Sequence, residues 1–395
     1  MASNYRFKDQ IRVAPEKLIE FAWSAPMRDL AKKVGISDVG LRKLLTGYGI
    51  VLPPQGHWNR VHAGRRVPDP PKPDPRRPGQ RQHLYLDERF ADILDCEPLA
   101  SPDGPFASAF VPESLDDLRE MLTRKIGRVG LPRKLDPLHP GLAGILKREQ
   151  ELRAKAAQAD RTWGVAKPLF DNPVDQRRLR ILNGLFWVLK KQGAAANAYE
   201  REAEIHAQAT VGSMHISISL EPKRGRSYAN RWSYPDQAAA LPASTPLVLS
   251  IRPSWDSELE RSWEDKDKSR IETCLADIVV ETIVGGEAAY RRSLRQEIER
   301  IEHALKAEAE AQRRRLAQAN EARLKALRRS GELLRQAQDI RSLIASVEEA
   351  VTAGEHDLTG LELKDWVDWA HGVANEIDPV KSGQVKEHLR PPKSE

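Results

Sequence analysis

The sequence has 395 residues, enough for two or three domains with buried hydrophobic cores. Charged residues make up 30% of it and no run of about eighteen apolar residues occurs, which excludes a membrane-spanning segment; two distant cysteines, Cys96 and Cys274, exclude a disulfide framework and a thiolate zinc site. The net charge is +6, but residues 1–80 carry 15 basic and 7 acidic side chains, so the positive excess lies entirely near the N-terminus.

The first residues, MASNYRFKDQIRV, lack the apolar core of a signal peptide, so we expect a cytoplasmic protein. Pro15 predicts the start of a helix over residues 15–24, because proline is favoured in the first helical turn. Apolar residues at helical spacing should cover the two helices that follow. These residues are Leu18, Ile19, Ala22 and Trp23.

Residues 27–46, MRDLAKKVGISDVGLRKLLT, match the helix-turn-helix DNA-binding template nearly residue for residue. Three side chains of the first helix should be buried: Leu30, Ala31 and Val34. Gly35 suits the left-handed corner, and Ile36 should fill it. Ser37 is a ready N-cap for a second helix, whose Leu41 and Leu44 should face inward.

The outward face of the second helix is expected to enter the major groove, where Arg and Lys read guanine edges. This face consists of Ser37, Asp38, Val39, Arg42, Lys43 and Thr46. We expect phosphate contacts from Arg60, Arg65 and Arg66, since a local positive excess is what phosphate binding needs. The alternative is a tight helical hairpin without a DNA-binding role, in which case the whole spacing would be accidental.

The segment after the motif contains Pro53, Pro54 and Gly56, which predict a rigid extended turn rather than more helix over residues 49–60. Trp58 should fold back onto the helices as a core anchor. Residues 64–80, GRRVPDPPKPDPRRPGQ, predict a stiff, partly extended arm with basic pairs at 65–66 and 76–77. Such an arm either follows the DNA or is only a charged spacer.

The middle region mixes helical and strand patterns. Helices are predicted at 114–126, 142–159 and 174–191, and alternation predicts a strand at 214–220. With neighbours at 203–209 and 246–252, it should form a small antiparallel sheet covered by helices on one face. A connecting loop alternates basic and aromatic residues, which favours either a nucleic-acid contact or a solvated loop. Its residues are Lys223, Arg224, Arg226, Tyr228, Arg231, Trp232 and Tyr234.

Helix formers dominate from about residue 265 to 351. A 4-3-4 spacing typical of a coiled-coil seam is formed by Leu294, Ile298, Ile301 and Leu305, and it resumes weakly at Leu316, Leu324 and Leu327. Gly331 could kink or reverse the helix; we favour one long helix with a local weakness there. A second apolar set should dock on a terminal helix over 361–377 that carries Trp366 and Trp369. This set is Leu333, Leu334, Ile340, Leu343, Ile344 and Val347.

No catalytic pattern stands out. A GxxxxGK phosphate loop is missing, and the pairs His57/His62 and His206/His215 lack metal-ligand spacing, which indicates surface or satisfied histidines. Glu221-Pro222-Lys223, with Asp171 and Asp175 upstream, is the one feature reminiscent of a magnesium-dependent nuclease. The proline at position 222 and the location of Asp171 and Asp175 at a predicted helix start, not on a strand, argue against a nuclease site. We therefore predict no catalytic residue, metal or cofactor.

The segment from Glu20 through WSAPMRDLAKKVGISDVGLRKL to LPPQGHW resembles the opening of a group of uncharacterised bacterial proteins. In that group an element like VW-S-x-P precedes the two-helix motif, and P-P-x-G-Y-W and a proline-rich basic linker follow it. The mixed middle region, the Glu/Arg-rich helix and a closing tryptophan helix are also similar. This chain has His57 where the group usually has tyrosine. The resemblance implies a bacterial origin and this architecture.

The predicted fold is mainly α with a small α+β middle domain. We expect a helix-turn-helix module at 1–63, a proline-rich basic linker at 64–82, the α+β domain at 83–263, a long coiled-coil helix at 264–352, and a C-terminal helix and tail at 353–395. The leading hypothesis is a double-stranded DNA-binding transcriptional regulator that dimerises through the long helix, with a possible protein partner on the middle domain. Two alternatives are a DNA-targeting subunit or nuclease of a defence or mobile-element system, and an architectural or partition protein.

Overall fold

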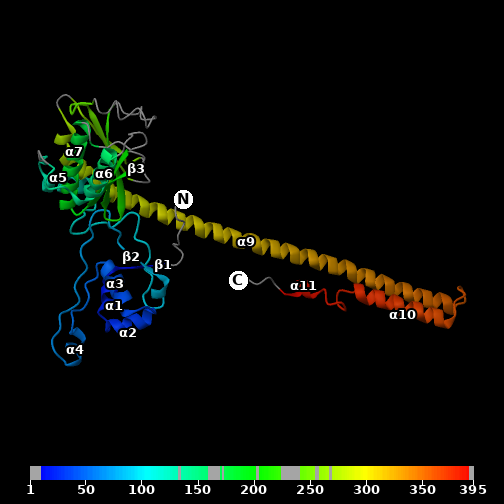
Figure 1. Cartoon of the computed structure of the whole chain (residues 1–395). Coiled ribbons are helices and arrows are strands. Elements are labelled where there is room, and N and C mark those ends of the chain that lie inside the picture. Colours follow the sequence, from blue (N-terminus) through cyan, green and yellow to red (C-terminus); the bar gives the residue numbers. More distant parts are fainter. Residues whose placement is uncertain are drawn as a thin grey trace. The chain divides into compact units, whose positions relative to one another are not determined.

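The computed structural model describes residues 10–131, 135–158, 170, 173–201, 204–223, 241–253, 258–266 and 269–390. The chain divides into two compact units, residues 1–298 and 299–395 (Figure 1). The described residues are mainly helical with small antiparallel sheets, as predicted. None of the described helices is both long and apolar enough to cross a membrane.

The first part of unit 1 is a group of short helices closed by a two-stranded sheet. Its elements are β1 (Gln10–Val13), α1 (Pro15–Ala22), α2 (Met27–Val34), α3 (Asp38–Gly47), α4 (His57–His62), β2 (Leu84–Asp87) and the 3-10 turn η1 (Glu88–Phe90). β1 pairs antiparallel with β2, so Ile11 lies opposite Leu86. We call residues 10–62 and 84–97 together the N-terminal module.

The core of the N-terminal module draws on both of its sequence segments. Fully buried side chains come from α1, α2, α3, β2 and η1: Leu18, Leu30, Leu41, Leu45, Leu86 and Phe90. The rings of Phe21 and Phe90 meet edge to face at 5.9 Å, and Glu97 and Arg12 exchange main-chain and side-chain hydrogen bonds. The predicted module of residues 1–63 therefore lacks a segment that completes this core.

The predicted extended turn over residues 49–60 is wrong at its end, because α4 begins at His57. The two prolines keep residues 50–54 out of helix, as predicted. Gly56 then takes a left-handed conformation (φ 77°) that reverses the chain and starts α4. A proline restricts the backbone before it and at its own position, so helix can start again three residues later.

The second part of unit 1 is a five-stranded antiparallel sheet with helices. The strands follow one another in sequence order: β3 (Ala195–Arg201), β4 (Glu204–Val211), β5 (Met214–Pro222), β6 (Leu247–Pro253) and β7 (Arg261–Glu264). The helices are α5 (Leu115–Ile126), α6 (Pro140–Gln158) and α7 (Pro173–Lys191). This confirms the three predicted helices and the three predicted strands. The sequence pattern did not reveal β3 and β7.

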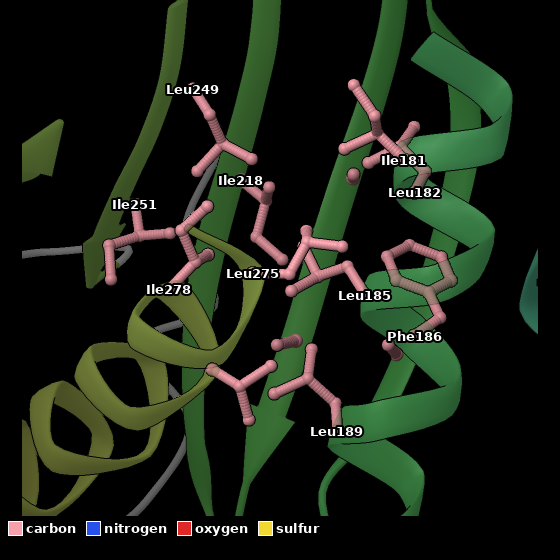
Figure 2. Packing of buried hydrophobic residues seen from close by; sticks show 14 of the residues in the cluster. Ile181, Leu182, Leu185, Phe186, Leu189, Ile218, Leu249, Ile251, Leu275 and Ile278 are labelled. Atoms are coloured by element: carbon pink, nitrogen blue, oxygen red, sulfur yellow. The ribbon is translucent and has the colours of Figure 1, made fainter. Parts of the chain in front are cut away.

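The main core lies between this sheet and the helices α5, α6 and α7, with the first turns of one further helix, α9 (Leu275–Thr352). Figure 2 shows Leu185 and Phe186 of α7 and Leu275 of α9 pointing toward Ile218 and Leu249 of the strands. Along β5 the alternate residues Met214, Ile216, Ile218 and Leu220 are buried, as the period of two predicts. The first turns of α9 thus belong to the core of unit 1, although the sequence placed the long helix outside the middle domain.

A buried ion cluster fixes the chain just before α9. The Arg177 guanidinium donates to Asp265 Oδ2 at 2.7 Å and to Glu272 Oε2 at 2.6 Å. Burial alone would raise the pKa of Asp265, but the bonds from Arg177 and from the Ile271 and Leu247 N–H groups outweigh it and lower the pKa. The described residues before α9 include a bridge between Lys266 and Ser269 and a 3-10 helix (η2, Ile271–Thr273), so α9 begins about ten residues later than predicted.

Unit 2 contains the rest of α9, which runs without interruption past Gly331 and confirms the prediction of one long helix. After a short turn, α10 (Gly360–Ile377) starts at a capping box formed by Thr359 and Glu362. It lies beside the end of α9 (Figure 1), and Arg341 donates to Asp378 at 2.8 Å. The terminal helix thus docks on the second part of α9, as predicted. A short helix, α11 (Lys386–Leu389), follows.

The contact between α9 and α10 differs from the prediction in its residues. The buried positions are mostly small: Ala337, Ile344, Ala370 and Ala374. Trp369 and Leu343, which the sequence assigned to this contact, are 65% and 56% exposed. Ile344 of the predicted set is buried, and the half-buried members are Leu333, Leu334, Ile340, Val347 and Trp366, so the prediction is confirmed for part of the set.

The predicted coiled-coil seam is also used differently. Leu294 is buried in a cluster with Phe106, Met214 and Tyr290, and Ile298 packs against that cluster. Only Leu305 of the four residues is widely exposed, at 61%. The first residues of the predicted seam, Leu294 and Ile298, therefore pack in a core of unit 1 and not against a second coiled-coil helix.

Candidate nucleic-acid interface

The corner between α2 and α3 has the geometry that its sequence predicts. Gly35 adopts φ 73° and ψ 30°, and the Ile36 N–H donates to the Ala31 carbonyl oxygen at 3.0 Å. The Ser37 hydroxyl oxygen accepts from the Gly40 N–H at 3.0 Å and so caps α3. Leu41 is fully buried, whereas the second inward position is Leu45 rather than the half-buried Leu44.

A glycine exchange tests how much this corner depends on its left-handed residue. Gly35→Ala should destabilise unit 1 by about 1–2 kcal/mol, because nothing crowds an added Cβ and the cost is that of the positive φ alone. Gly47→Ala, in helical backbone with equally open space, should be neutral or stabilising by up to about 1 kcal/mol. Urea unfolding of both variants measures this. Equal effects would contradict the corner geometry.

The outward face of α3 is open along its length. All six side chains predicted for it are exposed, namely Ser37, Asp38, Val39, Arg42, Lys43 and Thr46. Val39 is 70% exposed. Among the described residues, no acidic side chain forms an ion pair with Arg42 or Lys43. Ser37 is committed to its cap, so its oxygen is less available as an acceptor than predicted.

The surroundings of α3 are basic. Residues 10–66 contain ten Lys and Arg and four Asp and Glu. The predicted phosphate-binding residues Arg60, Arg65 and Arg66 are exposed. Three further exposed cations on α2, which the prediction omitted, are Arg28, Lys32 and Lys33. The local charge excess was the one sequence signal that could have identified them.

A buried histidine holds the segment after α3 against the module. His57 is 5% exposed, and its ring meets the rings of Trp23 and Trp58 edge to face, at 5.1 Å in each case. The Trp23 Nε1–H donates to the Val51 carbonyl at 2.8 Å. Trp58 does fold back, but the buried anchor is His57, which the sequence left as a surface or satisfied residue. This packing fixes α4, which carries Arg60.

The strand β2 contacts the C-terminal end of α3. The Tyr48 hydroxyl donates to the Tyr85 carbonyl, and Arg81 lies over the Tyr85 ring at 4.9 Å. Burial, with a smaller contribution from the Asp87 carboxylate, raises the pKa of Tyr48 above its ordinary value. The orientation of α3 is thus supported at both ends, by its cap and by β2.

The proline-rich segment does not remain free over its whole length. Arg76 donates to both carboxylate oxygens of Glu287, at 2.9 and 2.8 Å, and the Gly79 N–H donates to the same carboxylate. The Glu287 side chain is fully buried, and that of Arg76 is 9% exposed. Arg76, from the basic pair at 76–77, therefore forms a buried structural ion pair. Neither prediction for this segment, an arm that follows DNA or a charged spacer, included such a contact. Arg77 is exposed and lies over the Phe110 ring.

Two of the nuclease-like residues form ion pairs with other side chains. Lys223 pairs with Glu264, and buried Asp175 pairs with Arg178 at 2.9 Å. Within the residues that the structure describes, no group of three His, Cys, Asp or Glu could hold a metal ion. Asp171 and the basic and aromatic residues at 224–234 lie outside the described residues. The described geometry thus adds nothing in favour of a metal-dependent reaction.

Comparison with protein families, curated proteins and solved structures finds no match for this chain. Its own structural features therefore indicate the class of protein. These are a helix corner, a capped helix with an open polar and basic face, and a surrounding excess of cations. Together they describe a candidate surface for a polyanion that has a groove wide enough for a helix.

Proposed function

We propose that the protein is a double-stranded DNA-binding protein, acting as a dimer in bacterial transcriptional regulation. The observation that carries the proposal is the exposed face of α3, on which Arg42 and Lys43 stand without an ion-pair partner among the described residues. A surface of this kind costs little to desolvate against phosphate and base edges, since no internal ion pair has to be broken first.

In the proposed complex α3 lies in the major groove. Arg42 donates to the O6 and N7 atoms of a guanine, as a planar guanidinium does best, and Lys43 contacts a neighbouring base or phosphate. Val39 meets a thymine methyl, and the Thr46 hydroxyl contacts the adjacent base or backbone. Arg60, Arg65 and Arg66 bind phosphates beside the groove and fix the register of α3 without reading sequence.

Dimerisation would place two such modules on one duplex. A single N-terminal module would make few contacts with DNA. Two linked modules bind DNA more tightly, although neither module gains a new contact. Their half-sites should lie about 10 base pairs apart, or a multiple of this, because both helices must enter the groove from the same side.

Selection from random duplexes tests the proposal. The purified full chain is mixed with random double-stranded DNA at about 0.1 M salt, and the retained fragments are sequenced. We expect an enriched motif with two related half-sites, and binding that weakens steeply as salt rises, since several phosphates are neutralised. A retained pool without sequence enrichment would overturn specific recognition, and no retention would overturn DNA binding.

A further inference from the structure

Part of the surface of α9 in unit 2 is covered by other parts of the chain, whereas Leu305, Leu324 and Leu327 of the predicted seam are exposed. In unit 2, residues that recur at three and four positions along α9 are shielded by α10 and by the segment after it; Ala337, Ile344 and Ser330 are examples. The Arg323 guanidinium donates to the His388 carbonyl oxygen, and the His388 ring contacts the Ser330 hydroxyl at 3.0 Å. A second copy must therefore use another surface of the α9–α10 hairpin.

One such surface runs along α9 on a side that α10 leaves exposed. Its residues are spaced by four or three positions and so share one face of the helix. The positions are 313, 317, 320, 324, 327, 331 and 335. We call this the basic stripe: Arg313, Ala317, Asn320, Leu324, Leu327, Arg328, Gly331 and Arg335. All of these residues are exposed, and the two leucines are 47% and 52% exposed. The stripe thus places an apolar centre among three arginines.

The second surface lies on the side of α10 that faces away from α9. Ala370 and Ala374 mark the buried side, and the residues about half a turn away form what we call the acidic stripe. Its members are Leu361, Asp365, Asp368, Trp369, Gly372 and Glu376. Leu361 and Trp369 are 77% and 65% exposed, among the largest apolar exposures in the described chain. This stripe likewise has apolar residues beside three charges, of the opposite sign.

The charge of unit 2 is divided in the same way. Residues 313–335 contain eight basic and two acidic side chains, whereas residues 337–378 contain two basic and ten acidic ones. Within the described residues, Arg328, Arg335, Asp365 and Asp368 form no ion pairs. The stripes span about 33 Å and 22 Å of helix, so the acidic one fits within the length of the basic one.

We propose that the basic stripe of one copy packs against the acidic stripe of a second copy. The stripes of one chain cannot meet each other, because α10 is fixed to a different side of α9 by its alanine contact and by the Arg341–Asp378 pair. Two copies related by a two-fold axis satisfy both stripes twice, which gives a closed dimer. Pairing of like stripes would set arginine against arginine, so charge selects this arrangement. The inference rests on the dimer in the proposed function.

Charge reversal in the full chain tests the pairing. One variant carries Arg313→Glu, Arg328→Glu and Arg335→Glu; a second carries Asp365→Lys, Asp368→Lys and Glu376→Lys. Each alone should weaken self-association by roughly 100-fold in sedimentation velocity at 0.1 M salt, because like charges then oppose each other. An equimolar mixture of the two should recover the wild-type association, since the exchanged charges match again.

A matched control separates this effect from the change in net charge. Arg315→Glu, Lys325→Glu and Arg329→Glu alter the same charge on exposed residues of α9 outside the basic stripe, and this variant should associate like the wild type. Circular dichroism should show full helix content for every variant. A control that dissociates equally, or a mixture that fails to recover, would overturn the stripe pairing.

The remaining outcomes also decide between proposals. A wild-type dimer that tolerates both reversals would overturn the stripes and leave dimeric DNA binding intact. A wild-type monomer at all concentrations would overturn self-association itself, while the duplex selection tests DNA binding separately. If the basic-stripe variant lost duplex affinity and the acidic-stripe variant did not, the basic stripe would be a nucleic-acid surface and the pairing would be overturned.

Discussion

Replacing both Arg42 and Lys43 by alanine should weaken binding of a selected duplex by at least about 30-fold, because each good contact to a base edge contributes roughly 1–3 kcal/mol. The fold should be unaffected, since both side chains are exposed and neither has an ion-pair partner within the described residues. Gel retardation measures the affinity, and circular dichroism and thermal unfolding measure the fold.

The control removes two lysines elsewhere in unit 1. Lys190→Ala/Lys191→Ala alters the net charge equally at the exposed end of α7, far in sequence from the N-terminal module. We expect this variant to bind the duplex within about threefold of the wild type, because long-range charge effects are screened at physiological salt. Retained binding by the Arg42/Lys43 variant would remove α3 from the recognition role.

Arg76→Ala should destabilise unit 1 by about 3–5 kcal/mol, the largest loss of stability that we expect from a single exchange here. The Glu287 carboxylate is fully buried, and losing Arg76 would leave it with Arg291 and the Gly79 N–H as its described partners. Urea unfolding of the full chain, followed by circular dichroism, measures the effect.

Arg77→Ala is the matched control, since the two arginines are adjacent and belong to the same proline-rich segment. Arg77 is exposed and its described interaction is a ring contact with Phe110 at 5.5 Å, so its loss should cost less than about 1 kcal/mol. Similar losses from the two exchanges would mean that the ion pair with Glu287 contributes little to stability.

The parts of the fold that the sequence predicted well depend on local rules. The corner at Gly35, the cap at Ser37 and the exposed face of α3 each follow from residues within one or two helical turns along the chain. The strand alternation in β5 is equally local. For the same reason α9 could be recognised as one helix, because a single glycine costs only about 1 kcal/mol against 78 residues of helix.

The parts that could not be predicted depend on distant partners. Arg76 and Arg77 look alike in a proline-rich run, and only the position of Glu287, 211 residues away, makes one a buried ion pair. Leu294 has coiled-coil spacing, but Phe106 and Met214 cover it. Trp369 has the apolar character of a contact residue, but it lies outside the buried side of α10 that Ala370 and Ala374 mark. Periodicity identifies an apolar face without identifying what covers it.

The order of segments in the N-terminal module limits how such a module can be exchanged between proteins. Its core needs Leu86 and Phe90, which follow the proline-rich excursion, so a fragment that ends at residue 63 would leave Leu18, Leu30 and Phe21 without their packing partners. A transplantable copy of this module must therefore include residues 10–97 as one piece. Recombination inside the proline-rich stretch, the obvious joint by composition, would divide a single folding unit in two.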